Sequence, residues 1–329
     1  MGAYTNLQNI PLSVAVWLAH DEYDYDDRNN HISATSLLKS IRQIVLSTRV
    51  KKAEQTPDIS GLIPSTLGTA IHNGIEHAWV KNYKDSLLKL GVSKRVINRV
   101  KINPLPSELD EDCIPVYLEQ RAEKEIMGFI VSGKFDFIAE GRLEDFKSTS
   151  TYTYQFGTKD DDYSLQGSIY RWLNPDKITQ DEMAIQFIFT DWSASKARVE
   201  KDKGYPSSRI MEYKIPLKSI AETEAWIKNK LTEVRKYLTA PEETIPECSD
   251  KELWRKDPVF KYYKNPEKMT RSTKNFTNIS EAQLRMAQDG GVGIIVEQKG
   301  TVGACRYCDS FDVCTQKDKY IESGELVLN

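Results

Sequence analysis

The sequence lacks several features that define whole classes of protein. Among its 329 residues no apolar run approaches the roughly 18 residues needed to cross a membrane, which argues against a membrane-spanning protein. The N-terminal region has no basic start followed by a long apolar stretch, so we expect no secretory signal and a cytoplasmic location. Neither G-x-x-x-x-G-K-[ST] nor G-x-G-x-x-G occurs, which argues against a helicase and against a dinucleotide-dependent enzyme.

The chain also lacks an excess of basic residues. Its 45 Lys and Arg residues stand against 48 Asp and Glu residues, which gives a net charge of −3. The chain as a whole therefore does not carry the charge pattern typical of nucleic-acid-binding proteins, and any such surface has to be local. Hydrophobic residues make up 40% of the sequence and charged residues 28%, which is typical of a globular protein.

The hydrophobic pattern alternates between helix-like and strand-like periods along the chain. We expect helices at 33–50, 65–91, 164–173 and 220–238, and strands within 117–147 and at 183–193. This order predicts an α/β fold in which helices flank a mixed central β-sheet. Residues 1–243 are expected to form the main domain, with an N-terminal helical part. Residues 244–329 are expected to form a C-terminal module that packs on this core and is held together by a metal cluster.

The segment Gly133–Ser150, GKFDFIAEGRLEDFKSTS, is typical of a β-hairpin but carries an unusual set of charges. Asp145 and Lys147 are two residues apart and share a face, and Asp136 on the preceding strand can lie opposite Asp145. Two converging carboxylates repel each other unless a divalent cation lies between them, and Mg²⁺ or Mn²⁺ prefers such oxygen ligands. A neighbouring lysine can orient water or stabilise charge that develops on a phosphate. The alternative is a purely structural set of cross-strand ion pairs.

Three further polar side chains occur where they could face this hairpin. Gln166 and Tyr170 are four residues apart on the helix predicted to follow it, so they share a helix face. His72 lies on a predicted helix upstream and could complete a metal site. Taken alone, His72 is better explained as an ordinary core or surface histidine.

In this order, the residues resemble the RecB-like branch of the PD-(D/E)xK nucleases. That family has a helix histidine, a G-x-x-D strand, a D-x-K strand and a Q-x-x-x-Y helix. The matching positions are His72, Gly133–Asp136, Asp145–Lys147 and Gln166–Tyr170. The proline that names the superfamily is absent before Asp136. The resemblance implies a restriction-endonuclease-like core.

The resemblance also implies a role for each residue. The ligands of Mg²⁺ or Mn²⁺ would be His72, Asp136, Asp145 and the backbone carbonyl of Phe146. Glu119 or Glu123 could be a further acid upstream, and the sequence does not choose between them. Lys147 would position the attacking water and stabilise charge on the phosphate. Gln166 and Tyr170 would hold the DNA strand and steady the site.

The expected function is therefore that of a metal-dependent DNA nuclease, an exonuclease acting on single-stranded DNA or on DNA ends. The alternative is a catalytically weak or inactive nuclease fold that binds DNA within a replication or recombination complex. Because a helicase motif is absent, a separate helicase, polymerase or recombination protein is the expected partner. A free-standing nuclease of this kind favours a bacterium or a phage-infected host.

The five cysteines are concentrated towards the C-terminus. Cys305, Cys308 and Cys314 form the pattern C-x2-C-x5-C, and three thiolates at this spacing require a fourth ligand. Cys248 is the first candidate and Cys113, in an acidic loop, the second. Such soft ligands suit an iron–sulfur cluster or zinc.

RecB-like nucleases with a four-cysteine cluster end in a similar C-x2-C-x5-C pattern. This resemblance implies a [4Fe–4S] cluster, with zinc as the alternative. In those nucleases the fourth cysteine usually lies near the first helix, where this chain has none.

Aromatic and basic residues alternate between Cys248 and Cys305. Single-strand binders combine a positive track with aromatic stacking faces, so this segment could bind DNA. The alternative is that the aromatic rings pack into a hydrophobic core. The residues concerned are Trp254, Phe260, Tyr262, Tyr263 and Phe276.

Overall fold

The computed structural model describes residues 4–20, 26, 28–50 and 56–328. The chain divides into two compact units: unit 1 contains Met1–Leu38 and Ala53–Leu231, and unit 2 contains Lys39–Lys52 and Thr232–Asn329. The division predicted from the sequence came after residue 243 and assigned residues 39–52 to the first domain, whereas here they group with the C-terminal part. Within the described residues, every helix is too short or too polar to span a membrane.

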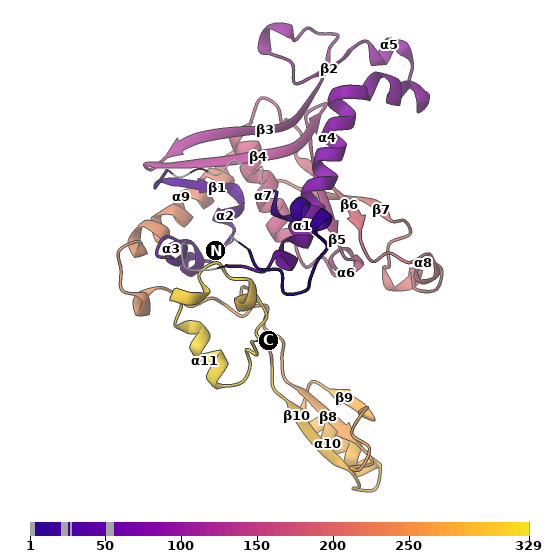
Figure 1. The fold of residues 1–329 in the computed structure, drawn as a ribbon, viewed down its shortest axis with the longest axis vertical. Helices are drawn as coiled ribbons and strands as arrows, with labels where there is room; N and C mark the ends of the chain where they lie inside the picture. The colour runs from indigo at the N-terminus through magenta and orange to yellow at the C-terminus, as the bar shows by residue number, and fades with distance from the viewer. Residues whose placement is uncertain (1–3, 21–25, 27, 51–55, 329) are drawn as a thin grey trace. The chain divides into compact units, whose positions relative to one another are not determined.

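Unit 1 is built on a mixed β-sheet in which β3 and β4 form a long antiparallel pair (Figure 1). The strand order is β2-β3-β4-β5-β6-β7, and β1 pairs with β4 outside that path. Parallel pairs join β1 to β4, β2 to β3 and β5 to β6, while the other neighbours are antiparallel. The strands are β1 (His31–Ser33), β2 (Val100–Ile102), β3 (Ile114–Ile126), β4 (Phe129–Ala139), β5 (Arg142–Thr149), β6 (Glu182–Phe189) and β7 (Ile210–Pro216).

Two tight turns set the register of the three central strands. Met127–Gly128 joins β3 to β4, with φ values of 52° and 73°, and Glu140–Gly141 joins β4 to β5, with φ values of 50° and 78°. Two-residue turns with positive φ match the twist of the strands that they connect. Each turn therefore fixes which residues of its two strands lie opposite each other.

One edge of β4 is divided between two partners. Residues 130–132 pair with β1, and residues 137–139 pair with β5. The other edge of β4 pairs with β3 along nearly its whole length. The stretch Gly133–Asp136 therefore pairs with neither β1 nor β5, and its edge is open to side chains from neighbouring elements.

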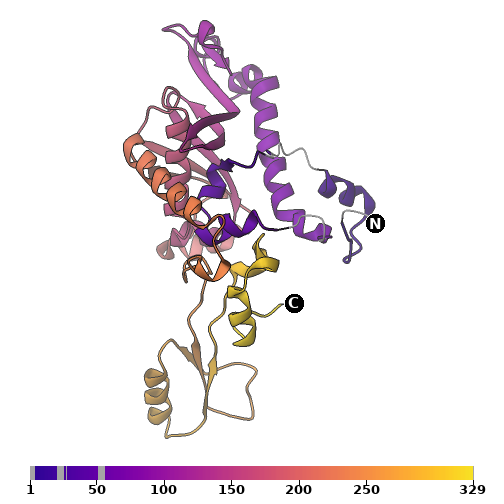
Figure 2. The ribbon, with the colours of Figure 1, turned by 90° about the vertical axis from the view of Figure 1, so that its left-hand side faces the viewer.

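Helices cover the sheet of unit 1, and Figure 2 shows α4 on one side of it and α9 on the other. The α-helices are α1 (Leu12–Ala19), α2 (Ala34–Leu37), α4 (Ile63–Lys89), α5 (Lys94–Ile97), α6 (Thr151–Phe156), α7 (Asp160–Leu173), α8 (Ala194–Val199) and α9 (Ile220–Tyr237), whose last residues belong to unit 2. Short 3-10 helices are η2 (Ile59–Leu62), η3 (Pro106–Glu108) and η4 (Lys201–Lys203). The predicted α/β fold with a mixed central sheet flanked by helices is confirmed.

The single helix predicted at 33–50 is wrong. The segment instead contains the end of β1, the short helix α2 and, after a break, α3 (Ile41–Ser47). Ser33 caps α2 by accepting a hydrogen bond from the Ser36 N–H at 3.1 Å. Ser40 and Gln43 form a capping box that begins a new helix, so the chain is interrupted where the apolar spacing alone predicts continuity.

Unit 2 combines α3 with the C-terminal part of the chain. Its other elements are η5 (Glu242–Thr244), β8 (Val259–Tyr263), β9 (Lys274–Phe276), α10 (Ile279–Gln288), β10 (Ile294–Gln298), η6 (Ala304–Tyr307), η7 (Phe311–Val313) and α11 (Gln316–Glu322). Residues 256–301 form a small lobe in which α10 packs on the sheet β10-β8-β9. Tyr262, Phe276 and Ala282 are the buried centre of this lobe.

Candidate active site and cysteine site

The open edge of β4 is occupied by the carboxylate of Asp136. Its Oδ2 atom accepts a hydrogen bond from the Phe146 backbone N–H of β5 at 2.8 Å. The carbonyl of the same residue lies 3.0 Å from Nε2 of His72 on α4. The His72 and Phe146 rings also meet edge to face, with centroids 5.9 Å apart. Both backbone groups of Phe146 are therefore held by predicted site residues, which fixes β5 between β4 and α4.

The other nitrogen of His72 points to two carboxylates. Nδ1 lies 3.5 Å from Asp136 Oδ1 and 3.6 Å from Glu119 Oε1. Burial lowers the pKa of His72, but the two carboxylates outweigh burial and raise this pKa to about 10. At neutral pH His72 is therefore an imidazolium that donates from both nitrogens. It supplies positive charge at a point where two acids converge.

Of the two upstream acids between which the sequence does not choose, Glu119 is the one that lies beside Asp136. It lies on β3 opposite Asp136, between the pairs Leu118–Phe137 and Gln120–Phe135, and it has a φ of 51°. The left-handed conformation is uncommon for a glutamate and interrupts the regular strand. Lys134 holds the second oxygen of Glu119 at 2.6 Å.

Glu123 is placed elsewhere. It lies opposite Ser132 and forms an ion pair with Arg28 at 2.6 Å. Asp136 is thus paired with Glu119 and not with Glu123. The two-residue turn at Met127–Gly128 was the signal in the sequence that could have settled this register.

Asp145 and Lys147 lie on the opposite face of β5 from Phe146. Asp145 is 2% exposed, and its Oδ2 atom lies 2.5 Å from Lys147 Nζ. Within the described residues this oxygen accepts no hydrogen bond of good geometry. Burial raises the pKa of Asp145 to about 6, although Lys147 opposes this shift and Asp136 adds to it. Burial lowers the pKa of Lys147, but Asp145 and Asp136 outweigh it and raise that pKa.

Gln166 and Tyr170 lie together on α7, as their spacing predicts. The Gln166 Nε2 group donates a hydrogen bond to the Tyr170 hydroxyl at 2.8 Å, and both residues are buried. Burial, followed by the charge of Asp145, raises the pKa of Tyr170, so the phenol stays protonated. A methyl group on Gly133 would lie 2.8 Å from two carbons of the Tyr170 ring. The glycine of the G-x-x-D pattern therefore makes the room that this tyrosine occupies.

The donor set around His72 suits a small divalent cation. One ligand atom each from His72, Glu119 and Asp136 lie within 4.8 Å of one another, and the Phe146 carbonyl adjoins them. Carboxylate, carbonyl and imidazole groups are ligands that Mg²⁺ and Mn²⁺ accept. The buried Asp145 oxygen, which Lys147 Nζ approaches at 2.5 Å, is a further carboxylate atom on the adjacent strand. The residues therefore fit the metal that the sequence predicts.

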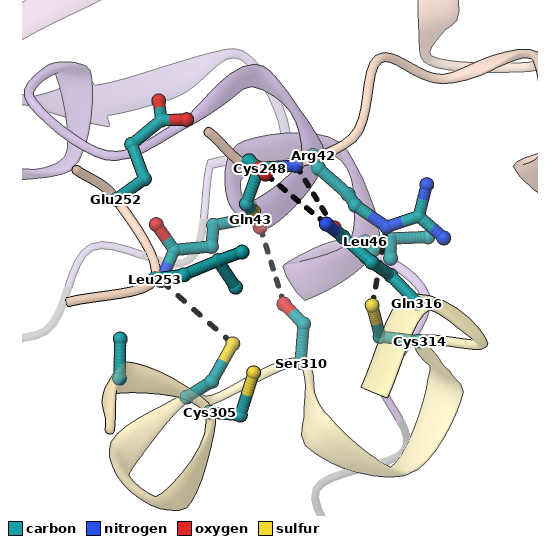
Figure 3. A pocket seen from close by; sticks show the side chains of 12 residues that line it. Arg42, Gln43, Leu46, Cys248, Glu252, Leu253, Cys305, Ser310, Cys314 and Gln316 are labelled. Carbon is teal, nitrogen blue, oxygen red and sulfur yellow. Dashed lines mark hydrogen bonds between the residues drawn. The ribbon is translucent and has the colours of Figure 1, made fainter. Parts of the chain in front are cut away.

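Four cysteines line one cavity of about 30 Å³ within unit 2 (Figure 3). They are Cys248, Cys305, Cys308 and Cys314. None of the described cysteines forms a disulfide. Gln316 holds the backbone of Cys248 on both sides, accepting from its N–H at 2.8 Å and donating to its carbonyl at 3.1 Å. The second candidate for the fourth position, Cys113, lies in unit 1 and does not line this cavity.

Helix α3 supplies polar groups to three of these sulfur atoms. The Ser40 hydroxyl lies 3.2 Å from Cys248 Sγ, Arg42 Nε donates to Cys314 Sγ at 3.1 Å, and Gln43 Nε2 donates to Cys308 Sγ at 3.7 Å. Figure 3 shows the side chains of Arg42 and Cys314 pointing at each other. The start of α3, which has no cysteine, thus contributes hydrogen-bonding groups to the cavity.

Two of the cysteines that line the cavity, Cys248 and Cys305, are held as neutral thiols. Burial raises the pKa of Cys248, and burial together with the other three cysteines raises the pKa of Cys305 to about 11. Arg42 places a positive charge next to Cys314 Sγ. This arginine is buried and also forms an ion pair with Glu242. Metal binding at this site would therefore require the release of protons.

The aromatic residues between Cys248 and Cys305 are mostly buried. Tyr262, Tyr263 and Phe276 are between 0% and 9% exposed and belong to the small lobe. The hypothesis that these rings stack on DNA bases is therefore wrong for all three. Phe260 is partly buried and packs against the same lobe, whereas Trp254 is 52% exposed and lies near Tyr307.

No protein-family model matches the sequence, and no curated protein is significantly similar to it. Among solved structures the chain is similar to one described as SSO0001, with 17% identity and a TM-score of 0.38 over 68% of this chain and 87% of the other. It is also similar to a phage related exonuclease from Haemophilus somnus 129PT. That match has 20% identity and a TM-score of 0.25 over 36% of this chain and 57% of the other. Scores this low do not establish a shared fold.

Proposed function

We propose that this protein is a metal-dependent DNA nuclease whose active site lies between α4, β3, β4, β5 and α7. The observation that carries the proposal is that Glu119 and Asp136 converge on His72, while His72 and Asp136 hold the two backbone groups of Phe146. The Asp145–Lys147 pair lies next to them on β5. The order of these residues also resembles that of RecB-like nucleases.

The residues that would hold Mg²⁺ or Mn²⁺ are His72, Glu119, Asp136, Asp145 and the Phe146 carbonyl. When bound, such an ion supplies Lewis-acid stabilisation of the phosphate and a nucleophilic water. Lys147 carries a positive charge at all physiological pH values and stands beside Asp145, where it can stabilise charge on the reacting phosphate. Tyr170 stays protonated, and its hydroxyl accepts the hydrogen bond of Gln166, which holds these two side chains together.

The substrate in this proposal is DNA, single-stranded or with free ends, and the expected mode is exonucleolytic. The protein would act in the cytoplasm of a bacterium or phage-infected host, beside a separate helicase, polymerase or recombination protein. A binding module without activity is the competing function. An intact Asp145–Lys147 pair favours catalysis, because binding alone does not require a lysine beside a buried carboxylate.

The four cysteines of unit 2 would hold a [4Fe–4S] cluster that stabilises the C-terminal part. Within the described residues, no three of their sulfurs lie within 4.8 Å of one another. Zinc with Zn–S bonds of about 2.3 Å would hold tetrahedral sulfurs about 3.8 Å apart. The wider spacing favours the larger cluster over zinc, and elemental analysis for iron, sulfide and zinc distinguishes them.

A cleavage time course tests the proposed function. End-labelled single- and double-stranded DNA is incubated with Mg²⁺, Mn²⁺ or EDTA and with wild type, Asp145→Ala or Lys147→Ala. We expect metal-dependent degradation that both variants abolish, and the position of the label gives the polarity. Asp85→Ala, which removes an exposed ion pair with Lys89, is the matched control and should keep full activity. Binding of DNA without any cleavage by the wild type would favour the binding module instead.

A further inference from the structure

Helix α6 exposes two aromatic rings immediately after the strand that carries Lys147. Tyr152 is 59% exposed and Phe156 is 61% exposed, and their ring centroids lie 4.5 Å apart. They are four residues apart and share the outer face of the helix. Large aromatic side chains are usually buried, so a pair of them on one exposed face requires an explanation.

The fold holds this pair firmly in place. Asp191, at the end of β6, accepts a hydrogen bond from the Thr151 N–H at 2.7 Å and anchors the start of α6. Tyr154, on the inner face, packs edge-on against Phe187 and Phe189 with centroids 5.8 Å and 5.6 Å away. Tyr154 therefore supplies the hydrophobic anchor of the helix. Its two aromatic neighbours are not needed for that purpose and are left at the surface.

A basic segment adjoins the aromatic pair. Gln155 of α6 donates a hydrogen bond to the Lys203 carbonyl of η4 at 3.3 Å, which ties the two segments together. The cations of this segment are Lys196, Arg198, Lys201 and Lys203, and all four are exposed. Figure 1 shows α6 and α8 as neighbours beyond β5. Among the described residues no acidic side chain forms an ion pair with any of these four.

We propose that α6 and the α8–η4 segment form a binding site for single-stranded DNA that leads the strand to Lys147. Bases would stack on Tyr152 and Phe156, and phosphates would contact the four cations. This inference rests on the proposed nuclease function and adds a substrate preference to it. The combination of exposed rings with a positive track is that of single-strand binders. Bases of a duplex are already stacked on each other, so the rings favour an unpaired strand.

The inference is tested by binding and by cleavage. The Asp145→Ala protein is titrated into a labelled 20-residue oligothymidine, alone and combined with Tyr152→Ala, Phe156→Ala or Tyr152→Phe. Each alanine should weaken binding by about 5-fold to 150-fold, since one base stacked on an aromatic ring has that effect. Tyr152→Phe keeps the ring, so the Asp145→Ala protein with this second change should bind as tightly as Asp145→Ala alone. Tyr307→Ala, which removes a 76% exposed ring in unit 2, should change nothing.

An oligonucleotide with abasic sites separates stacking from indirect effects. Wild type should bind it more weakly than the intact strand, and a protein carrying both Tyr152→Ala and Phe156→Ala should bind the two strands equally. In cleavage assays the alanine variants should raise KM for single-stranded DNA with little change in kcat. Equal affinity of wild type and both alanine variants, or equal affinity for intact and abasic strands, overturns the inference while leaving the nuclease intact. A shift of the alanine variants to a smaller assembly would also overturn it, because the rings would then bind a second copy.

The proposed function fails in a different way. If wild type neither cuts nor binds any DNA, the nuclease proposal falls and the inference falls with it. If wild type cuts DNA and the aromatic variants behave as wild type, only the inference falls.

Discussion

A single methyl group at Gly133 should damage both the stability of unit 1 and its active site. In Gly133→Ala the new Cβ would lie 2.8 Å from two Tyr170 ring carbons and 3.0 Å from Leu173 Cδ1. Carbon atoms in contact prefer about 3.5 to 4.0 Å, so the ring or the strand has to move by about 0.7 Å. Tyr170 is buried and bonded to Gln166, which leaves little room for that movement.

Overpacking of this kind costs about 1–3 kcal/mol, and the lower entropy of the unfolded alanine variant offsets about 0.5–1 kcal/mol of it. We therefore expect Gly133→Ala to lower the unfolding free energy by about 1–2 kcal/mol. For a unit of this size the melting temperature should fall by about 2–8 °C. Displacement of Tyr170 should reduce kcat about 10-fold to 100-fold, because catalytic groups tolerate little misplacement.

The matched control is Gly74→Ala on α4. Nothing lies within 4 Å of a methyl group at that glycine, and alanine is the better helix former by about 0.5–1 kcal/mol. Thermal unfolding and cleavage kinetics are measured for both variants beside wild type. Gly74→Ala should be slightly more stable and fully active. If Gly133→Ala were as stable and active as wild type, the packing account of the G-x-x-D glycine would be refuted.

Three other perturbations separate the two sites. His72 has a pKa of about 10, so it is protonated at pH 8, but it must be neutral to bind a metal ion. Binding of Mn²⁺ to the wild type should therefore release about one proton, and binding to His72→Gln should not release it. Calorimetry in buffers of different ionisation enthalpy measures the number of protons released. Arg42→Ala removes a buried cation from Cys314 and should lower the unfolding free energy by about 3 kcal/mol, whereas exposed Arg306→Ala should stay within about 0.5 kcal/mol in chemical denaturation. Cys308→Ser should lose the bound iron and melt earlier, and unchanged metal content would contradict the cluster.

The sequence predicted the central part of the structure because the pattern there is local. The β4–β5 hairpin turns near Gly141 as expected, and Phe146 points away from Asp145 and Lys147 because strand residues alternate. Gln166 and Tyr170 meet because the spacing of four is a helix repeat. These relations depend on short stretches of backbone with regular geometry.

Relations between distant segments were harder to predict. Choosing Glu119 over Glu123 requires the register of a long hairpin, which depends on the Met127–Gly128 turn and on an irregular φ at Glu119. The sequence also gave no reason to place Arg42 beside Cys314, because that contact joins residues far apart in the chain. The break before α3 could have been predicted from the sequence, since Ser40 and Gln43 have the spacing of a capping box. The helical spacing of the apolar residues continues across this break and favoured a single helix instead.

The small lobe enters and leaves the rest of unit 2 at one point. Lys256 and Thr301 form two backbone hydrogen bonds with each other, of 2.9 Å and 3.1 Å. The segments that lead into and out of the lobe therefore lie side by side at this point. A chain segment with adjoining ends can be removed or replaced without stretching what remains. We expect that a two-residue Asn-Gly turn in place of residues 257–300 would still deliver Cys248 and Cys305 to the same cavity. The lobe is in this sense an exchangeable insertion between two of the cysteines that line the cavity, and no residue of the lobe is among the lining residues.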